Sequence, residues 1–290
     1  MYVLYTDSDC DITPELARKY GYKKIMSMPY SYDGKTVYPY EDFEVFDYKP
    51  YYDMLRSGVI PTTSAISVDR YIHYIEDDFA AGNDILYVHL SPMLTATINN
   101  LDQALEILKE KYPERKLYKL NTKAVTTLSM AICEQVGKLY LEGKSPEEIL
   151  KWADTEVNNW SMYFFVEDLK FFKKSGRVGG LTATMGSILG IRPIIYMSPD
   201  GKMENIGTAR GRKRAIEALL EKMDKIGDHV TDYRIYVGHT DGRDALDETV
   251  KAIREKYGEK ADIEVQVANP TLGAHSGPDG IAVCFHSKGR

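Results

Sequence analysis

Short β-rich runs alternate with segments of helical length along most of the chain, and this alternation restricts the fold to a few classes. The first run, YVLYT at residues 2–6, is followed by Thr13-Pro14, which supplies a helix cap and a first helical position. Asp33-Gly34 then separates apolar runs at 24–32 and 35–38 and predicts a hairpin. Because parallel neighbouring strands need a crossover connection, the alternation predicts a parallel sheet with helices on both faces. Further elements are expected as strands at 85–89 and 117–120 and as helices at 68–80, 97–111, 126–141 and 145–156.

The elements after Trp160 form a second group. Pro199-Asp200-Gly201 predicts a hairpin within it, which makes the second sheet mixed. We therefore predict an α/β protein with two domains, residues 1–156 and 157–290. The elements expected in the second group are strands at 163–166, 194–197, 202–206, 234–239, 263–267 and 281–285 and helices at 167–174, 182–189, 212–226 and 244–257.

The composition is typical of a soluble globular protein. The 290 residues are 43% hydrophobic and 28% charged. No apolar run reaches the length of about eighteen residues that a membrane span needs, and the first residues, MYVLYTDSD, do not resemble a secretory signal. We expect a cytoplasmic protein without a membrane span. The net charge of −6 argues against nucleic-acid binding, which needs a surplus of Lys and Arg.

Neither a metal site nor a disulfide framework is expected. Cys10, Cys133 and Cys284 are odd in number, far apart and outside any CxxC pattern. The six histidines also lie without ligand spacing. The GxSxG, GxxxxGK[ST] and HExxH motifs of common enzymes do not occur. We therefore expect no cofactor and no metal.

Polar loops that follow strands are the candidate binding elements, because ligands in open α/β sheets bind outside the carboxyl ends of the strands. Turn closure best explains the first such loop, since Asp and Ser side chains bond to nearby backbone groups. The four loops are DSDCD at 7–11, PTTSAIS at 61–67, HLSPMLTAT at 89–97 and NPTLGAHSGPDG at 269–280.

The second and third loops carry more hydroxyl groups than helix capping requires. Ser67 precedes an expected helix and suits its N-cap, which leaves Thr62 and Thr63 without a structural role. Ser91 and Thr95 follow a strand and open a helix. Their hydroxyls, together with free backbone N–H groups, can converge on an anion.

Basic side chains and one histidine complete the candidate set. His275 lies where glycines and prolines bend the fourth loop tightly, so no packing role is expected for it, and a structural and a functional role stay equally open. Arg177 occupies the glycine-rich turn of KKSGRVGG. Arg210, Arg212 and Lys213 lie where a helix begins and face the positive end of its dipole. This placement favours contact with an anion or an acidic partner over a simple solvated face.

Eight motifs follow one another in a definite order: DS after the first strand, PTTSAIS, LSPMLTAT, LKFFKKSGRVGG, ILGIRPIIYMSPDGKM, RGRKRA, GHTD and NPTLGAHSGPDG. In this order, and over nearly the whole chain, the sequence resembles the DegV family of fatty-acid-binding proteins. The resemblance implies an N-terminal three-layer α/β/α domain, Rossmann-like with a parallel sheet, and a C-terminal α/β domain with a mixed sheet. It also implies a long-chain fatty acid with a buried tail and a carboxylate held by hydroxyls near the domain interface. In bacteria with a fatty-acid kinase, such carriers present the carboxylate for phosphorylation and are not themselves catalysts.

The resemblance also assigns roles to individual residues. It matches Thr63 to the second threonine of the family's TTS, Thr95 to the serine of SSxLSGT, His275 to the histidine of GAHSGP and Arg177 to the arginine of KxGR. Thr62, Ser64 and Ser91 are expected to assist at the carboxylate, and Arg210, Arg212 and Lys213 to dock a partner. The chain departs from the family at SPMLTAT, where Thr95 adds a methyl group and Ala96 narrows the approach of a ligand to the backbone. We expect the headgroup site to be kept and the preferred acyl chain to differ.

Two other functions are weighed against the carrier. An enzyme could use His275 with Thr63 or Ser276 for acyl or phosphoryl transfer, although a hydrolase also needs an acid that orients its base. A docking module could bind an acidic protein through RGRKR and take no small ligand. The partners expected of the carrier are a long-chain fatty acid and a fatty-acid kinase, with no nucleic acid and at most a transient contact with a membrane.

Overall fold

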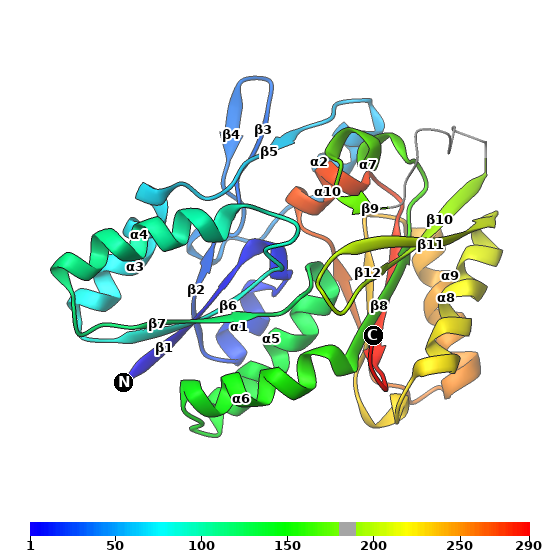
Figure 1. The fold of residues 1–290 in the computed structure, drawn as a ribbon. Coiled ribbons are helices and arrows are strands. Elements are labelled where there is room, and N and C mark those ends of the chain that lie inside the picture. The colour runs from blue at the N-terminus through cyan, green and yellow to red at the C-terminus, as the bar shows by residue number, and fades with distance from the viewer. Residues whose placement is uncertain (180–189) are drawn as a thin grey trace.

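The computed structural model describes residues 1–179 and 190–290, which form two large sheets with helices around them (Figure 1). The helix expected at 182–189 lies outside the described residues. The first sheet is fully parallel, as the alternation predicts, with the order β2-β1-β6-β7. Its strands are β1 (Tyr2–Asp7), β2 (Tyr22–Met26), β6 (Asp84–His89) and β7 (Leu117–Asn121).

Helices cover both faces of the parallel sheet, which confirms the α/β arrangement. One face carries α3 (Val68–Ala80) and α4 (Thr97–Lys111), and the other carries α1 (Pro14–Lys19) and α5 (Thr126–Leu141) (Figure 1). Among the helices of the described residues, none has the length and apolar character to cross a bilayer.

Side-chain caps begin several helices where the sequence predicts them. Thr13 Oγ1 accepts a hydrogen bond from the Leu16 N–H at 3.1 Å. Ser67 Oγ accepts one from the Arg70 N–H at 3.3 Å. Helix α6 (Pro146–Glu156) starts with the expected capping box, which Ser145 and Glu148 form. The caps at Thr13 and Ser67 fix the starts of the helices that follow the DSDCD and PTTSAIS loops.

The second sheet is mixed, as the hairpin at 199–201 predicts. Its order is β13-β12-β14-β8-β10-β11-β9, with β8 antiparallel to both β14 and β10 and with β12 parallel to β13. Its outer face carries α8 (Arg212–Ile226) and α9 (Arg243–Tyr257) (Figure 1). The strands are β8 (Trp160–Phe165), β9 (Val178–Gly179), β10 (Ile191–Met197), β11 (Met203–Arg210), β12 (Ile235–His239), β13 (Ile263–Val267) and β14 (Ile281–His286).

Helix α5 lies between the two sheets and packs against both. It contacts β1 on one side and β8, β12 and β14 on the other. All residues from Thr126 to Glu134 are buried, as a helix covered on every side requires. The carboxylate of Glu134 accepts hydrogen bonds from Tyr236 at 2.8 Å and from Arg234 at 3.1 Å. These bonds satisfy a buried charge and join α5 to the second sheet.

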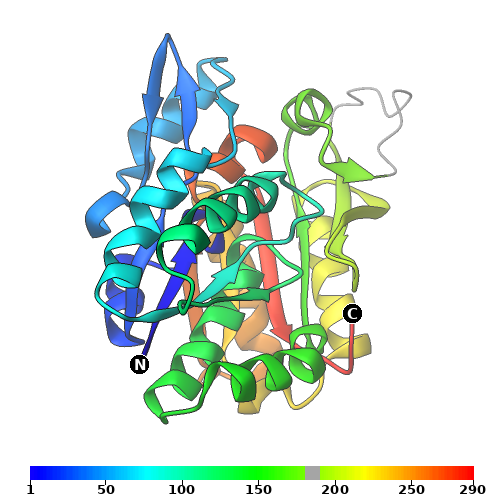
Figure 2. The same ribbon diagram turned by 60° about the vertical axis from the view of Figure 1, so that its left-hand side comes forward.

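The segment at 24–32, expected as one strand, is divided in two. β2 ends at Met26, and β3 (Tyr30–Tyr32) joins a separate antiparallel sheet with β4 (Lys35–Val37) and β5 (Thr62–Thr63). Pro29 lies at the break and has no N–H to continue a ladder. The hairpin turn itself is confirmed, because Asp33 and Gly34 have φ angles of 49° and 74°. The hairpin projects beyond the parallel sheet in both views (Figures 1 and 2).

Two helices form where the sequence predicts none. They are α2 (Tyr48–Arg56) and α10 (Pro270–Ser276), and α10 includes His275. Asn269 caps α10, because its Oδ1 accepts the Leu272 N–H at 2.8 Å. Gly273 lets the two helices approach closely, since a Cβ there would lie 2.9 Å from the Tyr51 ring and 3.0 Å from the Tyr52 ring. The prediction of a tightly bent loop without a packing role around His275 is therefore wrong.

Candidate functional site

A polar cavity opens between helix α10 and the loops that follow β1, β5 and β6. Its empty volume is about 730 Å³ with the open mouth included, which is a usual size for a small-molecule site. Leu90, Leu94 and Phe172 form part of its apolar wall. The structure thus brings together five of the residues that the sequence singles out. The polar side chains of the lining are Asp9, Thr63, Ser64, Thr95, Arg177, Thr271 and His275.

Thr63 and His275 are in direct contact in this cavity. Thr63 Oγ1 and His275 Nε2 are 2.9 Å apart, within hydrogen-bonding distance. Burial lowers the pKa of His275 to about 4, and the nearby positive charge of Arg177 acts in the same direction. The imidazole is therefore neutral at pH 7 and acts as a hydrogen-bonding group. Arg177 supplies the positive charge of the described lining.

The two threonines of β5 point to different surroundings. Successive side chains of a strand face opposite sides, so Thr63 lines the cavity and Thr62 is exposed. The Thr62 hydroxyl lies 3.5 Å from the Ser31 carbonyl oxygen, on the hairpin side. Ser64 follows at the rim of the cavity, and its N–H donates to Pro29. The expected assistance of Thr62 at a bound headgroup is not supported by its position.

Thr95 lies at the start of α4 with its hydroxyl proton available. Its Oγ1 accepts the Thr97 N–H at 3.2 Å, so the hydroxyl can still donate to a ligand. Ala96 is the N-cap residue of α4 and has no side chain to satisfy the free N–H groups of the first turn. The Thr97 hydroxyl is instead buried and accepts the Ile66 N–H at 3.1 Å. Of these residues, Thr95 and Ala96 line the cavity and Thr97 does not.

Ser91 supports the fold next to the cavity and does not line it. Its side chain is buried, and its Oγ accepts the Met93 N–H at 3.2 Å. It packs against the turn between β10 and β11, where a Cβ on Gly201 would lie 2.3 Å from the Ser91 oxygen. The expected contact of Ser91 with a carboxylate is therefore not supported. A serine that packs between two loops cannot be told apart from a ligand-binding serine by sequence position.

Arg177 lies at the mouth of the cavity. It follows α7 (Lys170–Ser175) and Gly176, whose φ of 66° ends that helix in a left-handed turn. The guanidinium donates to the Ser175 carbonyl oxygen. No carboxylate within residues 1–179 and 190–290 forms an ion pair with it, so its charge is available to an anion. A shallower hollow beside the mouth is lined by Arg177, Lys202 and Met93 among others.

The DSDCD loop contributes three buried carboxyl groups. Asp7 Oδ2 accepts from Tyr87 at 2.8 Å and from the Leu90 N–H at 3.1 Å. Asp11 Oδ1 accepts from the backbone and side-chain nitrogens of Asn269 at 3.0 and 2.6 Å. Turn closure is confirmed for Asp7, whose Oδ1 accepts the Asp9 N–H at 3.0 Å, whereas Asp11 binds the loop to Asn269, the cap residue of α10. Asp9 differs because it lines the cavity, and the sequence-based interpretation missed it.

An apolar pocket adjoins the polar cavity. It lies between α5 and the inner face of the second sheet, with an empty volume of about 400 Å³. Its walls include Met162 and Phe164 of β8 and Ala282 of β14. At Gly238 a Cβ would lie 2.1 Å from Thr127 Oγ1, so the glycine lets α5 approach β12. The two hollows share three wall residues, which are Val125, Met203 and Leu272.

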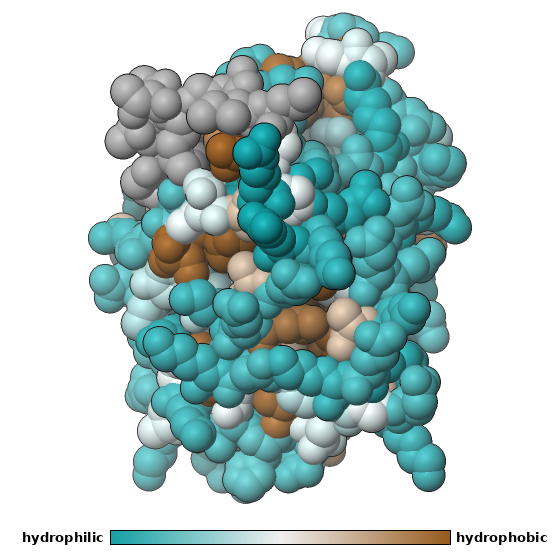
Figure 3. Space-filling model, turned by 90° about the vertical axis from the view of Figure 1, so that its right-hand side faces the viewer, coloured by the Kyte–Doolittle hydropathy of each residue, from teal (hydrophilic) through white to brown (hydrophobic). Residues whose placement is uncertain are grey.

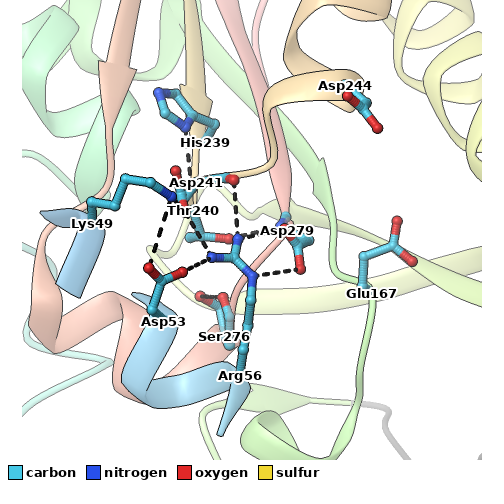
Figure 4. A network of polar contacts seen from close by, with 12 residues as sticks. Lys49, Asp53, Arg56, Glu167, His239, Thr240, Asp241, Asp244, Ser276 and Asp279 are labelled. Atoms are coloured by element: carbon cyan, nitrogen blue, oxygen red, sulfur yellow. Dashed lines mark hydrogen bonds and ion pairs between the residues drawn. The ribbon is translucent and has the colours of Figure 1, made fainter. Parts of the chain in front are cut away.

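Helix α2 holds the loops at the end of the apolar pocket (Figure 4). Arg56 donates to Asp241 at 2.7 Å and to Asp279 at 2.7 Å, and Lys49 lies 3.8 Å from Asp241. His239 Nδ1 accepts the Asp241 N–H at 3.1 Å. The GHTD motif therefore binds α2 to the second sheet through Asp241, and His239 and Asp241 are hydrogen-bonded to each other.

The arrangement around His275 lacks part of what a hydrolase needs. Ser276 Oγ donates to the Leu272 carbonyl oxygen at 3.0 Å, so it is not paired with His275. Among the described side chains, no carboxylate accepts a hydrogen bond from His275. Nucleophilic catalysis requires an activated hydroxyl, a base and a group that orients the base. The site has the first two in Thr63 and His275 and lacks the third.

The basic segment RGRKR begins α8, on a face that is mostly hydrophilic (Figure 3). Arg212 is largely engaged within the protein, because its guanidinium lies 3.4 Å from Glu248 and 4.0 Å from Glu167. Arg210 and Lys213 are exposed. Of the three residues predicted to dock a partner, Arg210 and Lys213 keep their charges accessible.

Known proteins of one family match this chain over nearly its whole length. The model of the DegV family, described as an uncharacterised protein family, matches residues 2–288. The DegV domain-containing protein CPE0026 of Clostridium perfringens is 28% identical over 284 residues, which cover 98% of this chain and 97% of that protein. A DegV lipid-binding protein from Thermotoga maritima has a similar structure, with a TM-score of 0.84, 22% identity and full coverage of both chains. A DegV family protein from Eubacterium eligens, solved loaded with heptadecanoic acid, has a TM-score of 0.83 and 24% identity and covers 99% of this chain and 100% of its own. The chain therefore belongs to the DegV family.

Proposed function

We propose that this protein is a carrier that binds a long-chain fatty acid, with the tail in the apolar pocket and the carboxylate in the polar cavity. The observation that carries the proposal is the shared wall of the two hollows, formed by Val125, Met203 and Leu272. A ligand that occupies both must have a polar head joined to an apolar tail. The relative from Eubacterium eligens, loaded with heptadecanoic acid, supports this class of ligand.

The energetics of such a ligand agree with the two linings. Burial of a methylene gains about 0.8 kcal/mol, so about fourteen of them contribute on the order of 11 kcal/mol before ordering costs. A buried carboxylate is expensive unless donors satisfy it. Thr63 and Thr95 supply hydroxyl donors, whose bonds to the charged carboxylate are strong, and Arg177 adds a positive charge at the exposed mouth.

We further propose that the carrier presents the carboxylate to a fatty-acid kinase in the cytoplasm. The carboxylate would lie near the mouth of the cavity, where Arg177 can contact it or an incoming phosphate. Arg210 and Lys213, which are exposed, are the side chains we assign to partner docking.

Native mass spectrometry of the purified protein, followed by lipid extraction, tests the carrier function. We expect a co-purified fatty acid at about one per chain, and rebinding of hexadecanoic acid after delipidation. A protein that is purified empty and does not bind hexadecanoic acid would overturn the proposal.

The contact between Thr63 and His275 at 2.9 Å also favours a second candidate, an enzyme that transfers acyl or phosphoryl groups. Its test is turnover of a long-chain aryl ester or an acyl phosphate by the delipidated protein. Turnover lost in both Thr63→Val and His275→Gln would establish the enzyme. Binding of the fatty acid without turnover would exclude it.

A further inference from the structure

We propose that Asp9 is a ligand-binding residue whose carboxyl group keeps its proton and donates an O–H hydrogen bond to the carboxylate of the bound fatty acid. The inference deepens the proposed function and rests on it. It adds a titratable hydrogen-bond donor to a site that otherwise holds hydroxyls, a neutral imidazole and one arginine.

The geometry separates Asp9 from its two neighbours. Asp9 belongs to a short 3₁₀ turn (Ser8–Cys10) and is 5% exposed, yet it lines the cavity beside Thr63 and Thr95. Its Oδ1 lies 3.5 Å from the Ser8 hydroxyl, a long and weak contact. No Lys, Arg or His in the described part of the chain forms an ion pair with it. Asp7 and Asp11 have backbone donors, whereas the donors to the Asp9 carboxyl group among the described residues are the side chains of Ser8 and Thr271.

The charges that face Asp9 favour its neutral form. Burial raises the pKa of Asp9 well above its usual value, and the carboxyl groups of Asp7 and Asp11 on the same loop act in the same direction. Thr271 of α10 opposes them through a hydrogen bond to the charged form. The buried phenol of Tyr40 also lies close enough to sense the charge of Asp9. His275 is neutral, and the charge of Arg177 lies at the exposed mouth.

A bound carboxylate strengthens the preference of Asp9 for its protonated form. Two carboxylates that share one desolvated site cannot both ionise, so one proton stays between them. The protonated acid then donates a strong, charge-assisted O–H···O⁻ hydrogen bond. If Asp9 has lost its proton in the free protein, binding must take one up, and affinity falls as the pH rises above the pKa of Asp9.

The test compares delipidated wild type, Asp9→Asn and Asp9→Ala in the binding of hexadecanoic acid across neutral and alkaline pH. The asparagine keeps a donor and cannot titrate, so we expect it to bind with an affinity that is flat with pH. The alanine should bind ~10- to 100-fold more weakly, as expected for loss of a hydrogen bond to a charged group. Asp154→Asn, which changes an exposed acid on α6 outside the cavity lining, should keep the wild-type form of the profile. Circular dichroism and thermal midpoints check that each variant is folded.

Infrared spectroscopy of the wild-type complex covers the case in which Asp9 never loses its proton or Asp9→Asn does not fold. Hexadecanoic acid labelled with ¹³C at the carboxyl group separates the ligand band from the protein bands. A band from a protonated protein carboxyl that shifts on binding supports the proposal, and an unshifted spectrum overturns it. An affinity of Asp9→Asn that falls with rising pH as steeply as that of wild type also overturns it. If neither protein binds hexadecanoic acid, the proposed function itself has failed.

Discussion

The polar cavity and the apolar pocket share a wall, yet their other walls come from different kinds of structure. Loops after β1, β5 and β6 and the helix α10 form the polar cavity. Strands β8, β12 and β14 and the start of α5 form most of the apolar pocket. Loop positions tolerate exchange more easily than positions in a packed sheet. The SPMLTAT segment lines the polar cavity with Leu94, Thr95 and Ala96 and is absent from the described lining of the apolar pocket. The expectation that its departure from the family changes the preferred acyl chain is therefore not supported.

The two hollows also differ in charge. The polar cavity holds a buried acid, an imidazole and an arginine, whereas the described lining of the apolar pocket includes no Asp, Glu, Lys or Arg. Apolar burial supplies affinity without direction, and polar contacts supply direction with little net affinity. The tail pocket should therefore govern how tightly a ligand binds, and the cavity should govern which headgroup binds.

Filling the apolar pocket should have the largest effect on binding. In Ala282→Phe the ring would displace about four methylenes of the tail, a loss of ~3 kcal/mol or roughly 100-fold in affinity. Fluorescence displacement with delipidated protein measures the loss. The same change at exposed Ala80 is the control and should bind as wild type does. Wild-type affinity in Ala282→Phe would show that the tail lies elsewhere.

Removal of the Thr63 hydroxyl should have the next largest effect. Thr63→Val preserves shape and removes the donor that faces the cavity, so we expect binding to weaken by about 1–3 kcal/mol. Thr62→Val makes the same change one residue away, on the exposed side of β5, and should have no effect. Isothermal titration with a fatty acid measures the affinities of both variants. Equal affinities in the two would remove Thr63 from the headgroup site.

His275 should make stability depend on pH in a defined direction. Its pKa is about 4 in the folded protein and about 6.5 in the unfolded chain, so the unfolded chain binds more protons between these values. Stability should therefore fall as the pH drops from about 6.5 to 4, by about 1 kcal/mol after allowance for partial exposure. Urea denaturation measures the free energy of unfolding at each pH. In His275→Gln this decrease at low pH should be absent, and in His73→Gln, which changes an exposed histidine, it should match that of wild type. The same slope in all three proteins would contradict the low pKa.

Loss of Arg177 should have the smallest effect on stability and retention of lipid. Arg177 is exposed and without an ion-pair partner in the described residues, so Arg177→Ala should leave the thermal midpoint and most of the bound lipid unchanged. We expect it to slow formation of the acyl phosphate with a fatty-acid kinase. Rates at equal lipid occupancy should be compared with those of Arg18→Ala, an exposed arginine on α1. A variant as active as wild type at every carrier concentration would assign Arg177 another role.

The sequence predicts the fold well where local patterns decide it. The alternation of strands and helices, the Asp33-Gly34 turn and the caps at Thr13 and Ser67 all appear in the structure. The predicted elements do not include α10, although Asn269-Pro270 is a cap followed by a first helical position. Its glycines suggested a loop, but Gly273 is required by the rings of α2, which lies more than 200 residues earlier. Packing over such a separation leaves no local pattern.

The sequence predicts the loops and the residue types that form the site, but it does not predict the position of every side chain. Strand alternation could have separated Thr63 from Thr62, because neighbours in a strand face opposite sides. The sequence does not show that Ser91 packs against Gly201, or that Arg212 pairs with Glu248, since both partners come from distant segments. The sequence predicts Asp9 as part of a turn. Asp7 is buried as well, so only the position of Asp9 in the cavity lining distinguishes the two residues.

Titration of delipidated protein with saturated fatty acids of increasing chain length tests the division between head and tail most directly. We predict that each added methylene strengthens binding by about 0.8 kcal/mol until the apolar pocket is full. In Thr63→Val the whole series should shift to weaker binding by a constant amount, with the slope unchanged. An affinity that does not depend on chain length, or a Thr63→Val series with a different slope, would contradict the assignment of the tail to one hollow and the carboxylate to the other.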